Sequence, residues 1–218
     1  MRYFIGLLSF FILISCSSEK VPKKEPKKEI KVVVVLSEEE KFLLKFDKKQ
    51  KDVYQNLKLY LAQLKLLNAD KIVEMTYPKF FSTFSEHTFR GQIFTMAHSS
   101  QIEIKSFNTK ILNIEKVEPF SNGEFAKVNY TSVVIVYFKN PELYSTEKSL
   151  NTLYSILVRK YGKKSIYVDV EKRLITITKE VKMLAIKETP DNWKFIGDNP
   201  EYRELYPNFL PYDILNNI

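Results

Sequence analysis

The 218-residue sequence contains few of the residues on which many known sites depend. It has one cysteine, two histidines and five glycines. One cysteine excludes an intramolecular disulfide, so the folded part of the chain must be stabilised by its apolar core. His87 and His98 are too far apart along one helix to share a metal ion. Loops that bind phosphate through their backbone need several glycines, and this sequence has too few to form many of them. Neither a P-loop nor a dinucleotide-binding motif is present.

The net positive charge of the folded part of the chain is also modest, because about half of the total lies near the N-terminus. The formal charge is +8, of which residues 17–31 carry +3 and residues 32–218 carry +4. Without an arginine-rich stripe, the sequence predicts no nucleic-acid partner. No catalytic motif is evident, and Asp169 and Glu171 flank a turn with Lys172 and Arg173, which favours a solvated turn over an acid pair. We therefore expect no cofactor, no metal and no identifiable catalytic residue.

The most distinctive segment that is present lies at the N-terminus. Met1-Arg2 precedes an uncharged, largely apolar run over residues 3–14. This run is too short to span a bilayer core of about 30 Å, and it fits the apolar region of a signal peptide. The run ends in Leu13-Ile14-Ser15-Cys16, which resembles the lipobox of bacterial lipoproteins.

The lipobox resemblance implies a location for the protein. In that family the cysteine receives a diacylglycerol thioether, the chain is cut before it, and the new N-terminus is acylated. Residues 1–15 would then be the signal peptide, and Cys16 would anchor the mature chain in the bacterial cell envelope, in the outer membrane of a Gram-negative cell. Secretion with simple cleavage and an uncleaved anchor are the alternatives. Two or more acyl chains hold a protein stably at a membrane, whereas one does not.

Residues 16–36 are expected to form a tether. The part over residues 17–31 consists mainly of Lys, Glu, Ser and Pro, and such a composition buries too little apolar area to offset chain entropy. It is either a solvated spacer or a segment whose lysines contact anionic head groups. The five apolar residues 32–36 then predict a short buried strand, an extended segment lying on the domain, or a strand that binds a partner.

The rest of the chain, over residues 37–198, shows helical patterns first and strand patterns later. Ser37 begins a capping box, and apolar residues then recur every three or four positions, which predicts one amphipathic helix or two nearly continuous ones. Asp70 and Ser85 are expected to cap two further helices. Asn122-Gly123 is a typical hairpin turn, a helix is predicted at 146–160, and a second hairpin follows it. This order predicts an α+β fold with N-terminal helices packed on a mostly antiparallel sheet.

Three segments of this pattern resemble the nuclear-transport-factor-2-like cone fold. They are Leu66-Leu67-Asn68-Ala69-Asp70, the pair Tyr77-Pro78 with Phe80-Phe81, and Asp191-Asn192-Trp193-Lys194-Phe195-Ile196. The resemblance covers about residues 48–198, and the helix at 146–160 departs from the usual sheet of that family. It implies a curved sheet that wraps helices, often with an apolar pocket open at one end.

Six aromatic residues are candidates for the lining of such a pocket, or else belong to a plain core. They are Tyr77, Phe80, Phe84, Tyr130, Tyr137 and Phe195. The C-terminal residues 199–218 are rich in aromatic residues and contain three prolines, which exclude a long helix. We expect this tail to pack on the domain.

Two function classes follow from these patterns. The favoured one is a membrane-tethered envelope lipoprotein that acts as a non-enzymatic binding or assembly module for an envelope protein or an apolar small molecule. The alternative is a small-molecule enzyme of the cone fold, resembling an isomerase, dehydratase or cyclase; a purely structural spacer is a third class. An ionisable group in a deep apolar cavity would favour the enzyme.

Overall fold

Side chains cap the N-termini of the first two helices. The computed structural model describes residues 36–141 and 146–218; the predicted signal peptide, Cys16 and nearly all of the tether lie outside these residues. Ser37 and Glu40 form the predicted capping box at the start of α1 (Glu38–Leu43). A second box, made by Asp47 and Gln50, starts α2 (Lys48–Leu66). The helical stretch is therefore two helices, separated where Asp47 satisfies the N–H groups of a new first turn.

The next two helices differ in how well their caps are predicted. The expected cap Asp70 is wrong: Asn68 caps α3 (Ala69–Met75), and Asp70 stands in its first turn. The reason is that Leu67 ends α2 in the left-handed conformation, with φ of 50°, so that Asn68 is already extended and can accept from the N–H of Lys71. A short 3₁₀ helix, η1 (Pro78–Ser82), follows. Ser85 caps α4 (Glu86–Ala97), as predicted.

Six strands then form one antiparallel sheet. They are β1 (Ile102–Ile114), β2 (Glu118–Phe120), β3 (Gly123–Phe138), β4 (Ile166–Asp169), β5 (Leu174–Glu188) and β6 (Lys194–Gly197). The order along the sheet is β1-β3-β5-β4, with β2 paired to β3 and β6 paired to β5. A hairpin joins β2 to β3 as predicted, but its turn residues are Ser121 and Asn122, and Gly123 is the first residue of β3; neither Asn122 nor Gly123 has the positive φ that an Asn-Gly turn implies. A side chain at Gly123 would collide with the Lys187 carbonyl, so the close approach of β5 requires glycine there.

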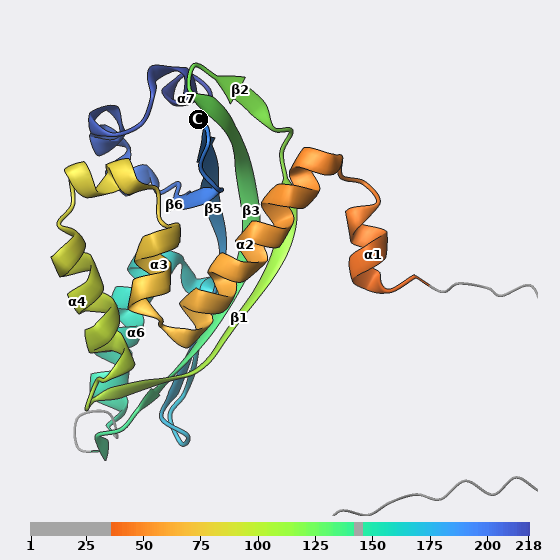
Figure 1. Cartoon of the computed structure of the whole chain (residues 1–218). Coiled ribbons are helices and arrows are strands. Elements are labelled where there is room, and N and C mark those ends of the chain that lie inside the picture. The colour runs from red at the N-terminus through yellow and green to blue at the C-terminus, as the bar shows by residue number, and fades with distance from the viewer. Residues whose placement is uncertain (1–35, 142–145) are drawn as a thin grey trace, which may run out of the picture. The chain divides into compact units, whose positions relative to one another are not determined.

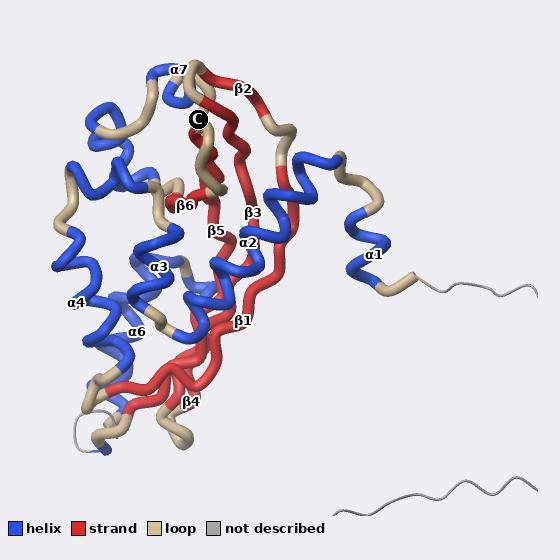
Figure 2. Tube along the Cα trace, viewed as in Figure 1, coloured by secondary structure: helices blue, strands red, loops and turns tan. Residues whose placement is uncertain are grey.

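The sheet is curved and not closed, and the helices before it lie on one of its faces (Figures 1 and 2). β1 has register shifts against β3 between Ile104 and Ser106 and between Ile111 and Asn113. Such bulges bend and twist a strand. The predicted inserted helix is α6 (Glu147–Tyr161), which starts at Thr146 and ends at Gly162. The α+β fold class is thus confirmed.

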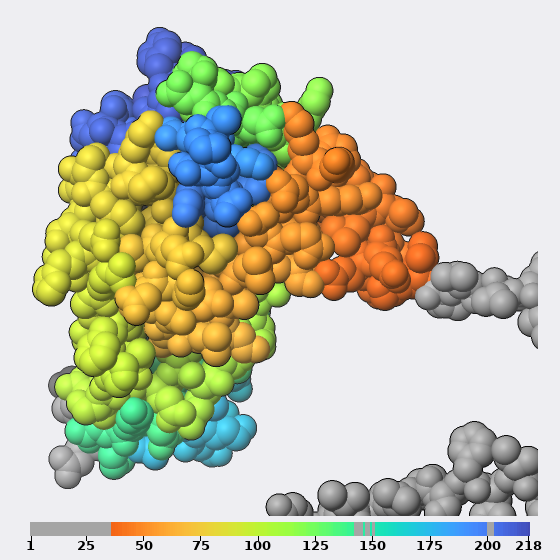
Figure 3. Space-filling view, in the orientation of Figure 1, coloured from red at the N-terminus to blue at the C-terminus, as the bar shows by residue number. Residues whose placement is uncertain are grey.

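Apolar residues gather in three clusters. Alternate residues of β3 and β5, among them Val128, Tyr130 and Met183, face α2 and α3 in the largest cluster. A second cluster lies under α6 and includes Phe138 and Ile175. Figure 3 shows that residues of α2, α3 and α4 form much of the surface on the side facing the viewer.

The third cluster is built around the C-terminal tail. The tail contains η3 (Pro200–Asn208), which is followed by a single turn, α7 (Tyr212–Leu215). Its buried members pack against strand residues that alternate with those of the largest cluster, and also against Phe80 and Phe84 on the helical side. The buried tail residues are Tyr206, Phe209, Leu210 and Ile214. Residues Ser37–Ile218 form one compact unit that includes this tail.

Candidate functional site

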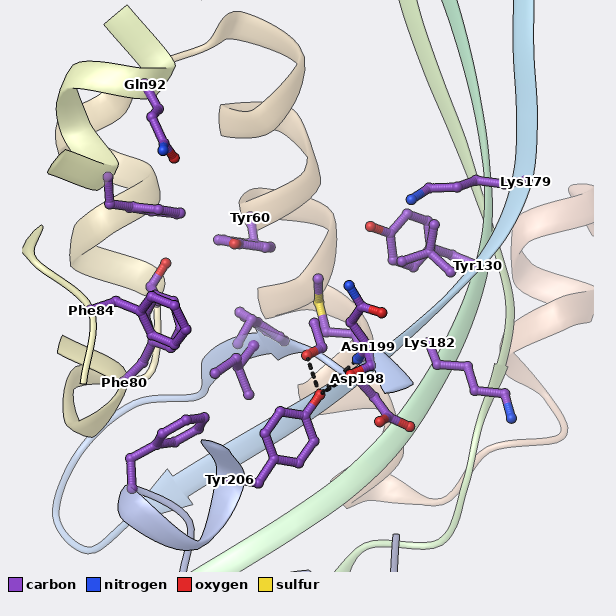
Figure 4. A pocket seen from close by; sticks show the side chains of 18 of the residues that line it. Tyr60, Phe80, Phe84, Gln92, Tyr130, Lys179, Lys182, Asp198, Asn199 and Tyr206 are labelled. Atoms are coloured by element: carbon purple, nitrogen blue, oxygen red, sulfur yellow. Dashed lines mark hydrogen bonds between the residues drawn. The ribbon is translucent and has the colours of Figure 1, made fainter. Parts of the chain in front are cut away.

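A cavity of about 700 Å³ lies between the helices and the concave face of the sheet. One side is formed by residues of α2, η1 and α4, and the other by residues of β3, β5 and β6 (Figure 4). Residues at the end of α6 and in η3 complete the lining. Its volume falls within the range of small-molecule sites, about 300–1,000 Å³.

The helical side of the cavity is aromatic. Phe80 and Phe84 are stacked with their ring centroids 4.3 Å apart, and the ring of Phe209 from the tail meets Phe80 edge-on at 5.7 Å. Tyr60 of α2 stacks on Phe195 of β6 at 5.1 Å. These contacts fix the rings in place, so the cavity offers a rigid apolar surface to a ligand.

The sheet side carries one hydroxyl group without a protein partner. Tyr130 of β3 is only 4% exposed and lies between Ile111 and Val181 of the neighbouring strands. Its side chain points into the cavity (Figure 4), and its hydroxyl has no hydrogen-bond partner among the described residues. Burial raises the pKa of Tyr130 above its ordinary value, and the nearby Tyr60 adds to this effect. The group therefore remains a neutral hydroxyl that can donate or accept a hydrogen bond at neutral pH.

The cavity is open because the outer strand of the sheet is interrupted. β4 pairs with β5 over residues 174–177, and β6 pairs with it over residues 183–186. Residues 178–182 of β5 therefore have no strand on their outer side, and Lys179, Glu180 and Lys182 from this stretch line the cavity. The gap between β4 and β6 therefore leaves the cavity accessible from this edge of the sheet.

The tail is held against the cavity by polar contacts. The Tyr206 hydroxyl accepts a hydrogen bond of 2.7 Å from the Asn199 N–H and donates one of 3.1 Å to the Gly197 carbonyl (Figure 4). Burial raises the pKa of Tyr206. Arg203 donates to both carboxylate oxygens of Asp198, each at 3.1 Å, and the Asp198 side chain is 6% exposed. Among the described lining residues, the one carboxylate that approaches burial, that of Asp198, is therefore already paired.

Four of the six aromatic candidates from the sequence line this cavity: Phe80, Phe84, Tyr130 and Phe195. Tyr77 and Tyr137 do not. Tyr77 is buried beside the tail and donates a hydrogen bond of 2.8 Å to Glu188. Tyr137 lies towards the other end of the sheet, where Arg173 and Lys105 approach its ring at 5.0 and 5.1 Å.

Other lining residues were missed by sequence reasoning. Tyr60 belongs to the apolar stripe of α2, and nothing in that stripe distinguishes a cavity residue from a core residue. Lys179 belongs to an alternating strand pattern and is typical of an exposed position. The aromatic tail offered one usable signal, because Tyr206 and Phe209 had to pack somewhere on the domain.

Other candidate groups lie away from the cavity. His87 and His98 are exposed and do not line it, and the His98 ring stacks on Phe94 at 4.1 Å. Within residues 36–141 and 146–218, no group of three or more His, Cys, Asp or Glu side chains is arranged to hold a metal ion. No helix in that same part of the chain is long and apolar enough to cross a membrane.

Comparison with known proteins returns no match. No family model, no curated protein and no solved structure matches this chain.

Proposed function

We propose that this protein is a lipid-anchored protein of the bacterial envelope whose domain binds an apolar small molecule without chemical conversion. The anchor rests on the Leu13-Ile14-Ser15-Cys16 pattern. The binding role rests on one observation above all: the Tyr130 side chain turns its hydroxyl into an aromatic cavity, where it makes no hydrogen bond to another described residue. A ligand in this cavity can therefore form a hydrogen bond with that hydroxyl while its apolar part contacts the aromatic rings.

The chemistry of the lining supports binding rather than catalysis. Burial raises the pKa values of Tyr60 and Tyr130, so neither hydroxyl serves as a base near neutral pH. Asp198 is held by Arg203, and Glu180 is exposed at the strand edge. The described lining thus supplies apolar contacts and hydrogen bonds, which are the means by which a binding site selects a ligand.

A neutral apolar fluorophore tests this proposal. The chain without its signal segment and cysteine, residues 17–218, keeps every described core contact because the three clusters lie within Ser37–Ile218. N-phenyl-1-naphthylamine should bind this form with increased fluorescence. Gln92 reaches into the cavity from α4 (Figure 4), so Gln92→Trp should weaken binding about fivefold or more by filling the space.

The control variant is Gln55→Trp, which adds the same ring at an exposed position of α2 outside the cavity lining. It should bind the fluorophore as the parent does. If the parent shows no binding, or if both tryptophan variants bind equally well, the cavity is not a site for apolar molecules and the proposal fails.

A further inference from the structure

We infer that the outer edge of β1 binds an extended, acidic segment of a partner protein, which pairs with β1 as an added strand. The segment would lie in a groove between this edge and the helices α1 and α2. This inference goes beyond the proposed function, because the groove and the aromatic cavity have no lining residue in common.

The backbone of β1 is open to pairing at this groove. β1 forms one border of the sheet (Figure 2), and the described part of the chain places no strand on its outer side. Residues 107–111 of β1 all line the groove, which has a volume of about 790 Å³. Successive side chains of a strand point to opposite faces, so five consecutive lining residues place the backbone edge itself in the groove. Unpaired N–H and C=O groups on such an edge are a template for a further strand.

The two helices form the other wall of the groove and are held together by side-chain contacts. Lys58 and Tyr54 of α2 donate hydrogen bonds of 2.7 and 3.1 Å to Glu39 of α1. The ring of Phe42 from α1 lies 6.0 Å from that of Tyr54. The groove is therefore present before a partner arrives, which lowers the cost of binding.

The groove has an excess of positive charge. Five lysines and two glutamates belong to its lining. Both glutamates are already paired, because Lys41 contacts Glu38 and Lys58 contacts Glu39, each at 2.7 Å. Three lysines thus remain for the carboxylates of a partner.

The three remaining lysines come from all three elements of the groove. They are Lys45 at the end of α1, Lys65 in the last turn of α2 and Lys110 of β1. All three are exposed, and no carboxylate of a described residue forms an ion pair with them. The Lys45 ammonium group lies 4.0 Å from the centroid of the Phe42 ring, a contact that leaves its charge in place.

This charge selects an acidic partner over two other occupants. Residues 17–36 of the chain itself contain six lysines and three glutamates, so they would bring further positive charge to the groove. A second copy of the protein would bring an identical lysine-lined edge, and like charges across an interface oppose association. A strand with carboxylate side chains matches both the charge of the groove and the backbone edge of β1.

Three rhodamine-labelled peptides test charge and backbone pairing separately. The first is Thr-Glu-Val-Glu-Val-Glu-Thr, the second has glutamine in place of each glutamate, and the third has proline in place of each valine. In fluorescence anisotropy with the form spanning residues 17–218, the first should bind about tenfold more tightly than the second, which has no carboxylate. The third keeps its charge but should also bind about tenfold more weakly, because proline cannot donate a hydrogen bond to a strand.

Lysine variants test whether the charge of this groove is responsible. Lys65→Gln and Lys110→Gln replace exposed side chains, so both proteins should fold. Each should weaken the acidic peptide about threefold and leave the glutamine peptide unchanged, and the double variant should weaken the acidic peptide about tenfold. Lys51→Gln removes an exposed lysine of α2 outside the groove and is the matched control, which should change neither affinity.

A disulfide experiment locates the bound peptide. The form spanning residues 17–218 has no cysteine, so Asn108→Cys introduces a single thiol at an exposed position of β1 in the groove. The acidic peptide with cysteine in place of one valine should form a disulfide with this variant in a glutathione buffer, because paired strands bring Cα atoms within disulfide distance. Lys51→Cys, outside the groove, is the control and should react at least tenfold more slowly.

Several results would overturn the inference while the proposed function stands, since they concern a different surface. One is equal binding of the glutamic acid and glutamine peptides, and another is equal binding of the valine and proline peptides. Equal disulfide formation at positions 51 and 108 or the absence of any peptide binding would also contradict it. Disulfide-linked pairs of Asn108→Cys chains without peptide would assign the groove to a second copy. Binding that begins only when residues 17–36 are removed would assign it to those residues.

Discussion

The indole Nε1–H of Trp193 donates a hydrogen bond of 2.8 Å to the carboxylate of Asp52, a residue 141 positions earlier in the chain. Trp193 precedes β6 and is 2% exposed, whereas Asp52 lies in the first part of α2. Lys187 of β5 places its ammonium group 3.7 Å from the same carboxylate. One side chain of the first long helix thus joins two segments of the sheet and orients the strand that carries Phe195 into the cavity.

This contact predicts a specific loss of stability. Asp52→Ala leaves the buried indole N–H without an acceptor and should lower the free energy of unfolding by about 1–3 kcal/mol. Asp52→Asn keeps an acceptor oxygen and should lose less. Urea denaturation of the two variants beside the parent measures the difference; equal stability of all three would mean that the hydrogen bond does not contribute.

The tail should contribute to the stability of the fold. Ile214 is fully buried, and Ile214→Ala should destabilise the domain by about 2–5 kcal/mol. Tyr212 lies two residues earlier and is 75% exposed, so Tyr212→Ala should change stability by less than about 0.5 kcal/mol. Thermal melts should show a lower midpoint for the first variant alone. A chain that ends at Gly197 should lose still more, and an unchanged midpoint would show instead that the tail is free.

Stability should also fall in acid through Glu39. Hydrogen bonds from Lys58 and Tyr54 lower the pKa of this carboxyl below its ordinary value of 4.5. A lowered folded-state pKa stabilises the fold above the unfolded-state pKa, and that stability is lost as pH falls through the folded-state value. Urea midpoints from pH 7 to pH 3 should therefore fall more steeply for the parent than for Glu39→Gln. Parallel curves for the two proteins would contradict this linkage.

The histidines should be dispensable for binding. Neither His87 nor His98 lines the cavity, so His87→Ala and His98→Ala should bind N-phenyl-1-naphthylamine as the parent does. Fluorescence titration measures this affinity. A large loss of binding in either variant, with the far-ultraviolet circular dichroism unchanged, would indicate that a histidine belongs to the site after all.

The proposed membrane anchor is tested at its own residue. Cys16→Ser removes the thiol that would form the proposed thioether, so the variant should move from the detergent phase to the aqueous phase in a partitioning experiment. Ser17→Ala leaves the cysteine in place and should stay in the detergent phase. A Cys16→Ser protein that still follows the detergent would show that the tether does not depend on this cysteine.

Local chemistry made much of the fold predictable. Ser37 and Ser85 cap helices because a hydroxyl followed by a suitable first turn satisfies free N–H groups nearby in sequence. A hairpin also forms where Asn122-Gly123 predicts one, but Ser121 and Asn122 are its turn residues, and Gly123 is required by the approach of β5 and not by a positive φ. The prediction of Asp70 as a cap was wrong because Leu67 adopts the left-handed conformation, so that α3 already starts after Asn68. Nothing in the sequence indicates this conformation for a leucine.

The cavity was not predictable in the same way. The sequence by itself determined the order of helices and strands, the caps at Ser37 and Ser85, and the aromatic residues available for a core, because each depends on neighbours a few positions away. Only the tertiary structure decided that Tyr130 would face Tyr60 across a cavity while Tyr137, seven positions further along the same strand, would lie elsewhere. It also placed the ammonium groups of Lys160 and Lys179 near the ring of Tyr161, and it left part of β5 without a neighbouring strand between β4 and β6. These relations depend on the curvature of the sheet and on long-range packing, and periodicity along a single segment carries no information about either.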